Sequence, residues 1–454
     1  MGEIIQNKTK GRISRFAGIL SLFAGIESLS MICSLIRAKF ISIWIGAVGV
    51  GLNAVLLQTS NLFSMVFQYG LRNSGVREMS ASKENMADTF AGIRKLSLTG
   101  GLAAAVLCLA LSWPISRMAF GNGQHAWQIA LLAPAIFFGA ISSGEFAAMQ
   151  ALGRLKRIAR ASVCSVISST IVALPMFKWL GLDSIVWVVN IFFAFSAFWA
   201  WIYRVKDYRE GKAPEIRKIF RVYAPLIKLA LWLTASAFIS SLCAYIFTLW
   251  LNYNASTETL GMYQAGFTVL NTYMGVLFSA LALEFYPRLS RTRGITRRII
   301  PVVTEQTSLI TLTSFPAALV LIAFAEIVVR MLYSSEFMSI TPMLRYGAPG
   351  VVARAFSYCL AYVMLVKGDG RVFMVTELTS GLISVLLNIF FFSFMGYEGL
   401  GIAYTLWYTI YAGMMATVCA RRYRMTLSAS RWAVAGVCYI IACVFAVLIS
   451  GIAG

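Results

Sequence analysis

Long apolar runs, most of them twenty residues or more, are separated by short polar segments along this sequence. A run of about 20 apolar residues is the length that an α-helix needs to cross the hydrocarbon core of a bilayer. The alternating apolar and polar residues that membrane β-strands require are absent. The sequence therefore predicts an all-α protein that crosses a membrane many times.

Twelve of these runs predict twelve core transmembrane helices, and a further run at 430–453 predicts a thirteenth. The twelve runs cover residues 14–36, 50–72, 95–117, 127–149, 157–179, 184–203, 224–250, 260–283, 303–331, 341–366, 373–395 and 398–420. We expect a six-helix bundle at 1–204, a cytoplasmic linker at 205–222, a second six-helix bundle at 223–421 and the additional helix within 422–454.

The basic residues lie mostly between the apolar runs, and their distribution predicts the orientation of the chain. The formal net charge is +21, which in a soluble protein would suggest nucleic-acid binding. Lys and Arg gathered in the loops of one side are instead typical of the cytoplasmic face of a membrane protein. The densest group lies between Arg204 and Arg221, whereas the opposite side holds only Arg37, Lys39, Arg117, Lys178, Arg330 and Arg345. We therefore expect a cytoplasmic N-terminus and no nucleic-acid partner.

Similar residues recur at one offset in the two predicted bundles. Six pairs are 215 residues apart, namely Gly46 and Gly261, Gly51 and Gly266, Gly153 and Gly368, Lys156 and Arg371, Gly181 and Gly396, and Asp183 and Glu398. Because each repeat would hold an even number of helices, both halves would enter the membrane in the same direction, as in transporters with parallel repeats. Coincidence among loop glycines is the alternative.

Common sequence motifs of nucleotide-binding, metal-binding and hydrolase sites are missing from the sequence. It has no GxxxxGK[ST], HExxH or GxSxG, its 8 cysteines form no CxxC pair, and it has 1 histidine. No predicted outer loop is large enough to hold an acid or base for glycan chemistry. We therefore expect no catalytic residue, no metal site, no cofactor and no enzymatic activity.

Ionisable residues inside membrane helices are costly and so become candidates for function. Glu27 lies near the middle of the helix predicted at 14–36 and shares one helical stripe with Ser30, Ser34 and Arg37. Glu145 lies beside Ser142 and Ser143 in the run at 127–149. Such carboxylates face either a water-filled cavity or a partner on another helix, and the sequence leaves both open.

Arg354 lies midway along the run at 341–366. Arginine keeps its proton in proteins, so at this depth it needs an anion or a carboxylate; a structural pair with Glu27 or Glu145 is the alternative to a functional role. A further polar stripe consists of Glu377, Ser380, Ser384 and Asn388, of which Glu377 is close enough to the cytoplasmic end to be interfacial.

Other polar residues admit two interpretations each. Lys228, one turn into the run at 224–250, lines an inward vestibule or extends its ammonium to the headgroups. Polar rows in the runs at 50–72 and 260–283 include Asn53, Gln58, Gln264, Thr268 and Asn271. They either bond helix to helix or line a cavity that solvates sugar hydroxyls.

Several short segments, in their order along the helices, resemble the polysaccharide (O-antigen, Wzx-type) flippases of the multidrug/oligosaccharidyl-lipid/polysaccharide exporter superfamily. They are Lys10–Arg15, Gly46–Gly51, Glu258–Tyr263, Phe285–Ser290 and Gly396–Gly401, and the likeness spans about residues 10–420. The helix predicted at 430–453 departs from the twelve-helix layout of that family.

The resemblance implies two six-helix lobes around a central cavity in the bacterial inner membrane. The substrate would be an undecaprenyl-diphosphate-linked oligosaccharide, a repeat unit of O-antigen, capsule or exopolysaccharide, moved from the inner to the outer leaflet by alternating access. Expected partners are that lipid-linked oligosaccharide, membrane lipids and other polysaccharide assembly proteins. Arg37, Lys228 and Arg354 would contact the anionic headgroup, and Asn53 and Asn271 would also bind the substrate. Glu27 and Glu145 would couple transport to protons or sodium ions.

Three other functions stay open. A cation-coupled multidrug antiporter of the same superfamily would prefer an acidic cavity, so Arg354 facing the cavity would count against it. A membrane glycan polymerase or ligase would need the large outer loop that the sequence lacks. A structural scaffold would explain the loops but not the ionisable residues within helices.

Overall fold

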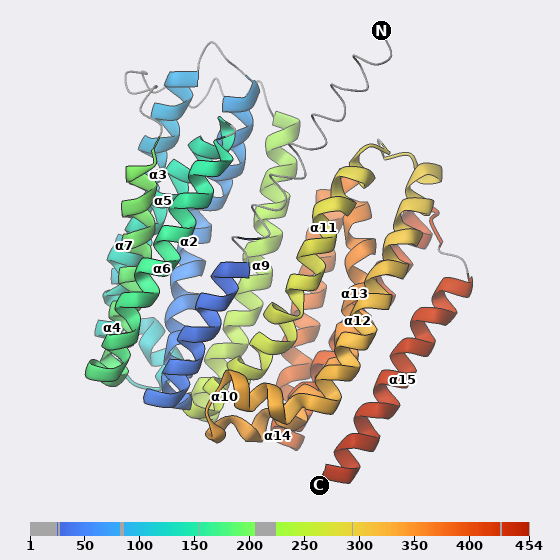
Figure 1. Cartoon of the computed structure of the whole chain (residues 1–454). Coiled ribbons are helices and arrows are strands. Elements are labelled where there is room, and N and C mark those ends of the chain that lie inside the picture. Colours follow the sequence, from blue (N-terminus) through green and yellow to red (C-terminus); the bar gives the residue numbers. More distant parts are fainter. Residues whose placement is uncertain are drawn as a thin grey trace. The chain divides into compact units, whose positions relative to one another are not determined.

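The computed structural model describes residues 25, 28–81, 86–152, 154–204, 224–292, 294–426 and 429–453. Within these residues the chain is helical, with short turns and without β-strands, so the predicted all-α class is confirmed (Figure 1). Eight segments of the described chain are long and apolar enough to cross a membrane. The protein is therefore a multi-pass membrane protein, although the predicted number of twelve or thirteen crossings is not confirmed.

The chain divides into two compact units. Unit 1 comprises Met1–Arg37, Phe63–Ile115 and Gln124–Ile227, and unit 2 comprises Ala38–Leu62, Ser116–Gly123 and Lys228–Gly454. The long helices α2 (Ala47–Ala81) and α3 (Met86–Phe120) each contribute residues to both units. The predicted division into bundles at 1–204 and 223–421 stays a prediction.

Unit 1 holds most of α3 together with four further helices and one 3-10 turn. These are α4 (Ala126–Ala130), α5 (Leu132–Ala151), α6 (Leu155–Leu180), η1 (Gly181–Asp183) and α7 (Ser184–Ile202). Helix α5 packs against α6 and α7. Small residues bring α3 close to α5, because a Cβ on Gly144 would lie 2.7 Å from Ser97 Oγ. This close approach positions the α3–α5 pocket described below.

Unit 2 holds the remaining elements. They are α9 (Ala224–Asn254), α10 (Thr257–Phe267), the π-helix η2 (Thr268–Tyr273), α11 (Gly275–Ser290), α12 (Thr296–Leu332), η3 (Ser335–Ile340), α13 (Thr341–Val366), α14 (Gly370–Tyr423) and α15 (Ala429–Ala453). Helix α13 packs against α12, α14 and α15. Leu344, Ala348, Val351, Ala355 and Cys359, spaced three or four residues apart, are fully buried along it. Helix α13 is thus the core of unit 2.

Two glycines turn the chain back in the same way. Gly181 has φ 56° and ψ −132°, and Gly396, inside α14, has φ 58° and ψ −131°. An L side chain rarely adopts this conformation, so glycine is needed at both places. The two positions are 215 residues apart, as the repeat predicts. The pair Gly46 and Gly261 is not equivalent in this way, since Gly46 lies in the turn before α2 with φ 81° and Gly261 lies within α10.

Residues 38–62 come early in the chain but belong to unit 2, where they contact several later elements. Ser334 N donates to Ser42 Oγ at 3.1 Å, and Thr59 Oγ1 and Tyr245 Oη are 2.7 Å apart. Gln58 accepts from Thr248 Oγ1 at 2.9 Å and donates to Gln264 Oε1 at 3.3 Å. For Gln58 and Gln264 the structure therefore shows bonding from helix to helix.

Candidate functional site

The first candidate site lies in unit 2 around Arg354 of α13. Its guanidinium donates from Nη1 to the backbone oxygen of Asn271 at 2.8 Å. The guanidinium carbon lies 5.0 Å from the ring centre of Phe278 and 5.5 Å from that of Tyr408. Both distances are within the range of cation–π attraction. Arg354 is therefore held by one carbonyl and two aromatic faces.

The carbonyl that Arg354 binds belongs to the π-helix η2. Met274 N donates to Val269 O at 3.3 Å, which is the i to i+5 pattern of a π-turn. The wider turn presents carbonyls to side chains, and two of them are used. Tyr404 Oη donates to Leu270 O at 3.1 Å, beside the bond from Arg354 to Asn271 O. Such π-turns occur frequently at functional sites.

Tyrosines of α14 complete this arginine–tyrosine network, which consists of Arg354, Asn271, Tyr404 and Tyr408. Tyr408 Oη donates to Asn271 Oδ1 at 3.3 Å, and the rings of Tyr404 and Tyr408 are 4.8 Å apart. No carboxylate of the described residues forms an ion pair with Arg354. Glu145, the alternative partner from the sequence, forms an ion pair with Arg94 in unit 1. Glu27 lies outside the described residues.

Glu377 of α14 links three helical segments in the same unit. Its Oε1 accepts from Tyr411 Oη at 2.5 Å and its Oε2 accepts from Ser240 Oγ of α9 at 3.1 Å. One turn further along, Trp407 Nε1 donates to Ser380 Oγ at 2.8 Å. Two residues of the predicted polar stripe, Glu377 and Ser380, therefore contact α9 or the part of α14 that follows the kink at Gly396.

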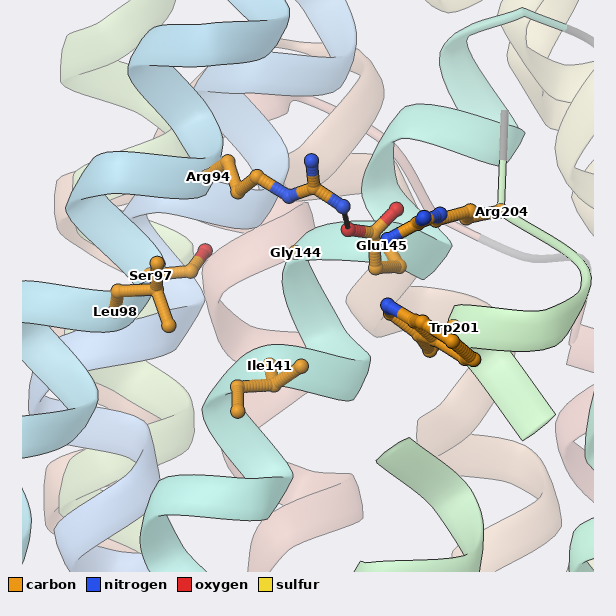
Figure 2. A pocket seen from close by; sticks show the side chains of 8 residues that line it. All are labelled: Arg94, Ser97, Leu98, Ile141, Gly144, Glu145, Trp201 and Arg204. Carbon is orange, nitrogen blue, oxygen red and sulfur yellow. Dashed lines mark hydrogen bonds and ion pairs between the residues drawn. The ribbon is translucent and has the colours of Figure 1, made fainter. Parts of the chain in front are cut away.

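The second candidate site is a cavity of 240 Å³ within unit 1, which we call the α3–α5 pocket (Figure 2). It is lined by Arg94, Ser97 and Leu98 of α3, by Ile141, Gly144 and Glu145 of α5, and by Trp201 and Arg204 at the end of α7. Arg94 Nη2 binds Glu145 Oε1. The predicted intramembrane carboxylate Glu145 thus lies beside two arginines.

The other predicted site residues are distributed over the chain. Arg37 belongs to unit 1, where its guanidinium carbon lies 5.3 Å from the ring centre of Phe192 of α7. Asn53 is partly buried in α2 within unit 2. Lys228 lies in α9, and its side chain is outside the described part of the structure. Within unit 2 the structure brings together two of the predicted headgroup ligands, Arg354 and Asn271.

Tyr404, Tyr408 and Arg94 were not expected at a site. A signal for the tyrosines is present in the sequence, since Tyr404, Tyr408 and Tyr411 follow one another at helical spacing on one face. For Arg94 there is no such signal, because it reads as one of many basic residues in a loop next to the membrane.

Comparison with known families gives a match over most of the chain. The family model described as "Polysaccharide biosynthesis protein" matches residues 46–342. The chain belongs to this family. A search of curated proteins finds no match.

Solved structures similar to this family member show its fold. One is the lipid II flippase MurJ in an inward closed conformation, with a TM-score of 0.71 and 12% sequence identity. The match covers 95% of this chain and 97% of the MurJ chain. A multidrug resistance MATE family transporter of the MOP superfamily, inward-facing, gives TM-score 0.64 at 13% identity over 89% of this chain and 94% of its own. A MOP superfamily transporter from Pyrococcus furiosus gives a TM-score of 0.56 at 13% identity, and the match covers 89% of this chain and 95% of that transporter. The predicted fold class of this superfamily is therefore confirmed.

Proposed function

We propose that this polysaccharide biosynthesis protein is a flippase that moves an undecaprenyl-diphosphate-linked oligosaccharide from the inner to the outer leaflet of the bacterial inner membrane. The observation that supports it most directly is Arg354, a cation inside a candidate membrane span with no carboxylate partner among the described residues.

The chemistry of Arg354 suits a diphosphate. An arginine at the centre of a membrane helix costs about 2.5–3.5 kcal/mol, so its charge requires compensation from water, ring faces or an anion. The guanidinium has five N–H donors, and Asn271 O accepts from one of them. Phosphate oxygens accept two parallel bonds from such a group. The hydroxyls of Tyr404 and Tyr408 belong to the same network, and because each donates its proton to a protein oxygen, each can still accept a bond from a sugar hydroxyl.

The family and fold support the same substrate class. A family of polysaccharide biosynthesis proteins needs its sugars on the far side of a membrane, and a charged headgroup does not cross hydrocarbon unaided. MurJ, which shares the fold, is described as a lipid II flippase. In this proposal the N-terminus is cytoplasmic, two halves alternate in access, and other assembly proteins use the flipped product.

The remaining candidate residues take roles in this proposal. Arg37, Lys228 and Asn53 assist in headgroup binding, and Glu27 couples transport to protons or sodium ions. Asn271 acts by positioning, because its backbone oxygen holds Arg354 and its side chain holds Tyr408. Glu145 stays a second coupling candidate in this proposal; it forms an ion pair with Arg94 and lines the α3–α5 pocket.

The test is replacement of Arg354 at matched membrane abundance. Arg354→Ala should abolish surface glycan in cells that depend on this protein, and Arg354→Lys should restore part of it, because lysine keeps the charge without the planar fork. Arg371→Ala, an exposed arginine at the start of α14, is the matched control. Normal glycan in Arg354→Ala cells, or no movement of fluorescent lipid-linked oligosaccharide by wild-type proteoliposomes, would sink the proposal.

A second candidate is a cation-coupled multidrug antiporter, which the fold shared with the MATE transporter favours. Glu377, bound inside unit 2 by Tyr411 and Ser240, would be its coupling carboxylate. Drug susceptibility decides between the two. An antiporter would protect cells against cationic drugs in a Glu377-dependent manner and leave surface glycan unchanged when deleted.

A further inference from the structure

The α3–α5 pocket contains a carboxylate oxygen that none of the described residues satisfies. The Glu145 side chain is 4% exposed, and its Oε1 accepts from Arg94 Nη2. Its Oε2 is buried and has no hydrogen-bond partner among the residues that the structure describes. Buried carboxylate oxygens are normally bonded, and leaving one unbonded is costly. Because Glu145 lines the cavity, a ligand in the pocket that carries a hydrogen-bond donor could bond this oxygen (Figure 2).

Arg204 supplies the opposite charge on another wall of the same cavity. Its guanidinium carbon lies 4.6 Å from the ring centre of Trp201, and no described carboxylate forms an ion pair with it. Arg204 is close enough to Glu145 for the two charges to interact, but no hydrogen bond joins them. The pocket thus offers a carboxylate acceptor and a guanidinium donor a short distance apart.

The position of the pocket along the helices is that of a membrane interface. Helix α5 ends at Ala151 and α7 ends at Ile202, and both contribute to candidate membrane spans. Glu145, Trp201 and Arg204 lie within two turns of these helix ends. Tryptophan and arginine at this level are typical of the headgroup region. Leu98 and Leu102 of α3 are 40% and 58% exposed, and provide an apolar surface for acyl chains next to the pocket.

We propose that the α3–α5 pocket binds the headgroup of a phosphoethanolamine lipid. The primary ammonium donates to Glu145 Oε2, and the phosphate accepts from Arg204, with Arg94 holding the carboxylate in place. Phosphatidylcholine lacks the N–H donor. Phosphatidylglycerol offers hydroxyl donors but no cation, so it would bind Glu145 without the attraction between opposite charges. This inference does not rest on the proposed flippase function, because it concerns a lipid of the surrounding membrane.

Lipid retention by the purified full-length protein tests the assignment. The protein is exchanged into mixed micelles that contain dioleoyl phosphatidylethanolamine, its mono- and dimethylated forms, phosphatidylcholine or phosphatidylglycerol, and bound lipid is counted by native mass spectrometry. Retention should fall with each added methyl group, and phosphatidylcholine should bind about tenfold more weakly, as expected for the loss of one charge-assisted hydrogen bond. Equal retention of all five lipids overturns the proposal.

Two variants locate the site. Glu145→Gln and Arg204→Ala should each remove the preference for phosphatidylethanolamine. Asp183→Asn and Arg160→Ala, exposed residues of unit 1, are the matched controls and should keep it. If Glu145→Gln does not fold, the methylation series on the wild-type protein still decides the question. Free phosphoethanolamine should compete poorly; displacement of the lipid at equal concentration would show that the pocket recognises a soluble ligand and overturn the lipid assignment.

Discussion

Gly51 of α2 and Gly261 of α10 allow their helices to pack backbone to backbone within unit 2. A Cβ on Gly261 would lie 1.9 Å from Ala47 O, and a Cβ on Gly51 would lie 2.1 Å from Thr257 O. Each glycine follows a small residue, Ala47 or Thr257, by four positions, which is the spacing that brings membrane helices together. This contact attaches the early residues 38–62 to the later helices of unit 2.

Replacing either glycine should separate α2 from α10. Gly261→Ala is expected to lower the free energy of unfolding by about 1–3 kcal/mol, because its methyl group meets backbone that has no space to move. Thermal unfolding in detergent measures the loss. Gly413→Ala, a helical glycine with no atom within 4 Å of the added Cβ, is the control and should be neutral or stabilising. Equal melting temperatures for both variants would contradict the predicted clash.

The two turning glycines should respond alike. Gly181→Ala and Gly396→Ala meet no atom within 4 Å, so steric contact contributes nothing to their effect. Their backbone conformation alone should cost about 1–3 kcal/mol at each position. Gly436→Ala, in open space on α15 and without a positive φ, provides the comparison. A large difference between the first two variants would argue against equivalent turns in the two repeats.

Tyr408 is expected to act on Arg354 mainly through its ring. Tyr408→Phe keeps the ring and removes the donor to Asn271 Oδ1, which should cost about 0.5–1.5 kcal/mol of stability and leave transport largely intact. Tyr408→Leu also removes the cation–π contact and should reduce transport further. Surface glycan and thermal unfolding are compared at matched abundance. A larger defect in Tyr408→Phe than in Tyr408→Leu would refute a role for the ring.

The bond between Tyr411 and Glu377 should be worth more than a surface ion pair. A double-mutant cycle with Glu377→Gln and Tyr411→Phe is expected to give a coupling of about 1.5–3 kcal/mol, the range for hydrogen bonds to charged groups. The same cycle with Arg288→Gln and Glu305→Gln probes an exposed pair and should give about 1 kcal/mol or less. Similar couplings in the two cycles would show that Glu377 is effectively solvated.

The sequence predicted well what depends on local chain properties. The length and polarity of the apolar runs indicated membrane helices, because backbone groups in hydrocarbon have to bond within their own segment. The repeat offset correctly paired Gly181 with Gly396, since a turn with positive φ requires glycine in both halves. Arg354, Glu145 and Glu377 were found for a similar reason, as charges that stand out in apolar runs.

Only the tertiary structure decided which groups those charges meet. Glu145 binds Arg94, Arg354 binds a carbonyl of the π-helix and two aromatic faces, and Glu377 binds Tyr411 and Ser240. These partners lie 34 to 137 residues away, the nearest being Tyr411 and the farthest Ser240. Helices in a membrane associate through the shape of their surfaces and a few polar groups, so the periodicity of one helix does not identify its neighbour. The charges are thus a property of the sequence, and the groups that contact them are a property of the fold.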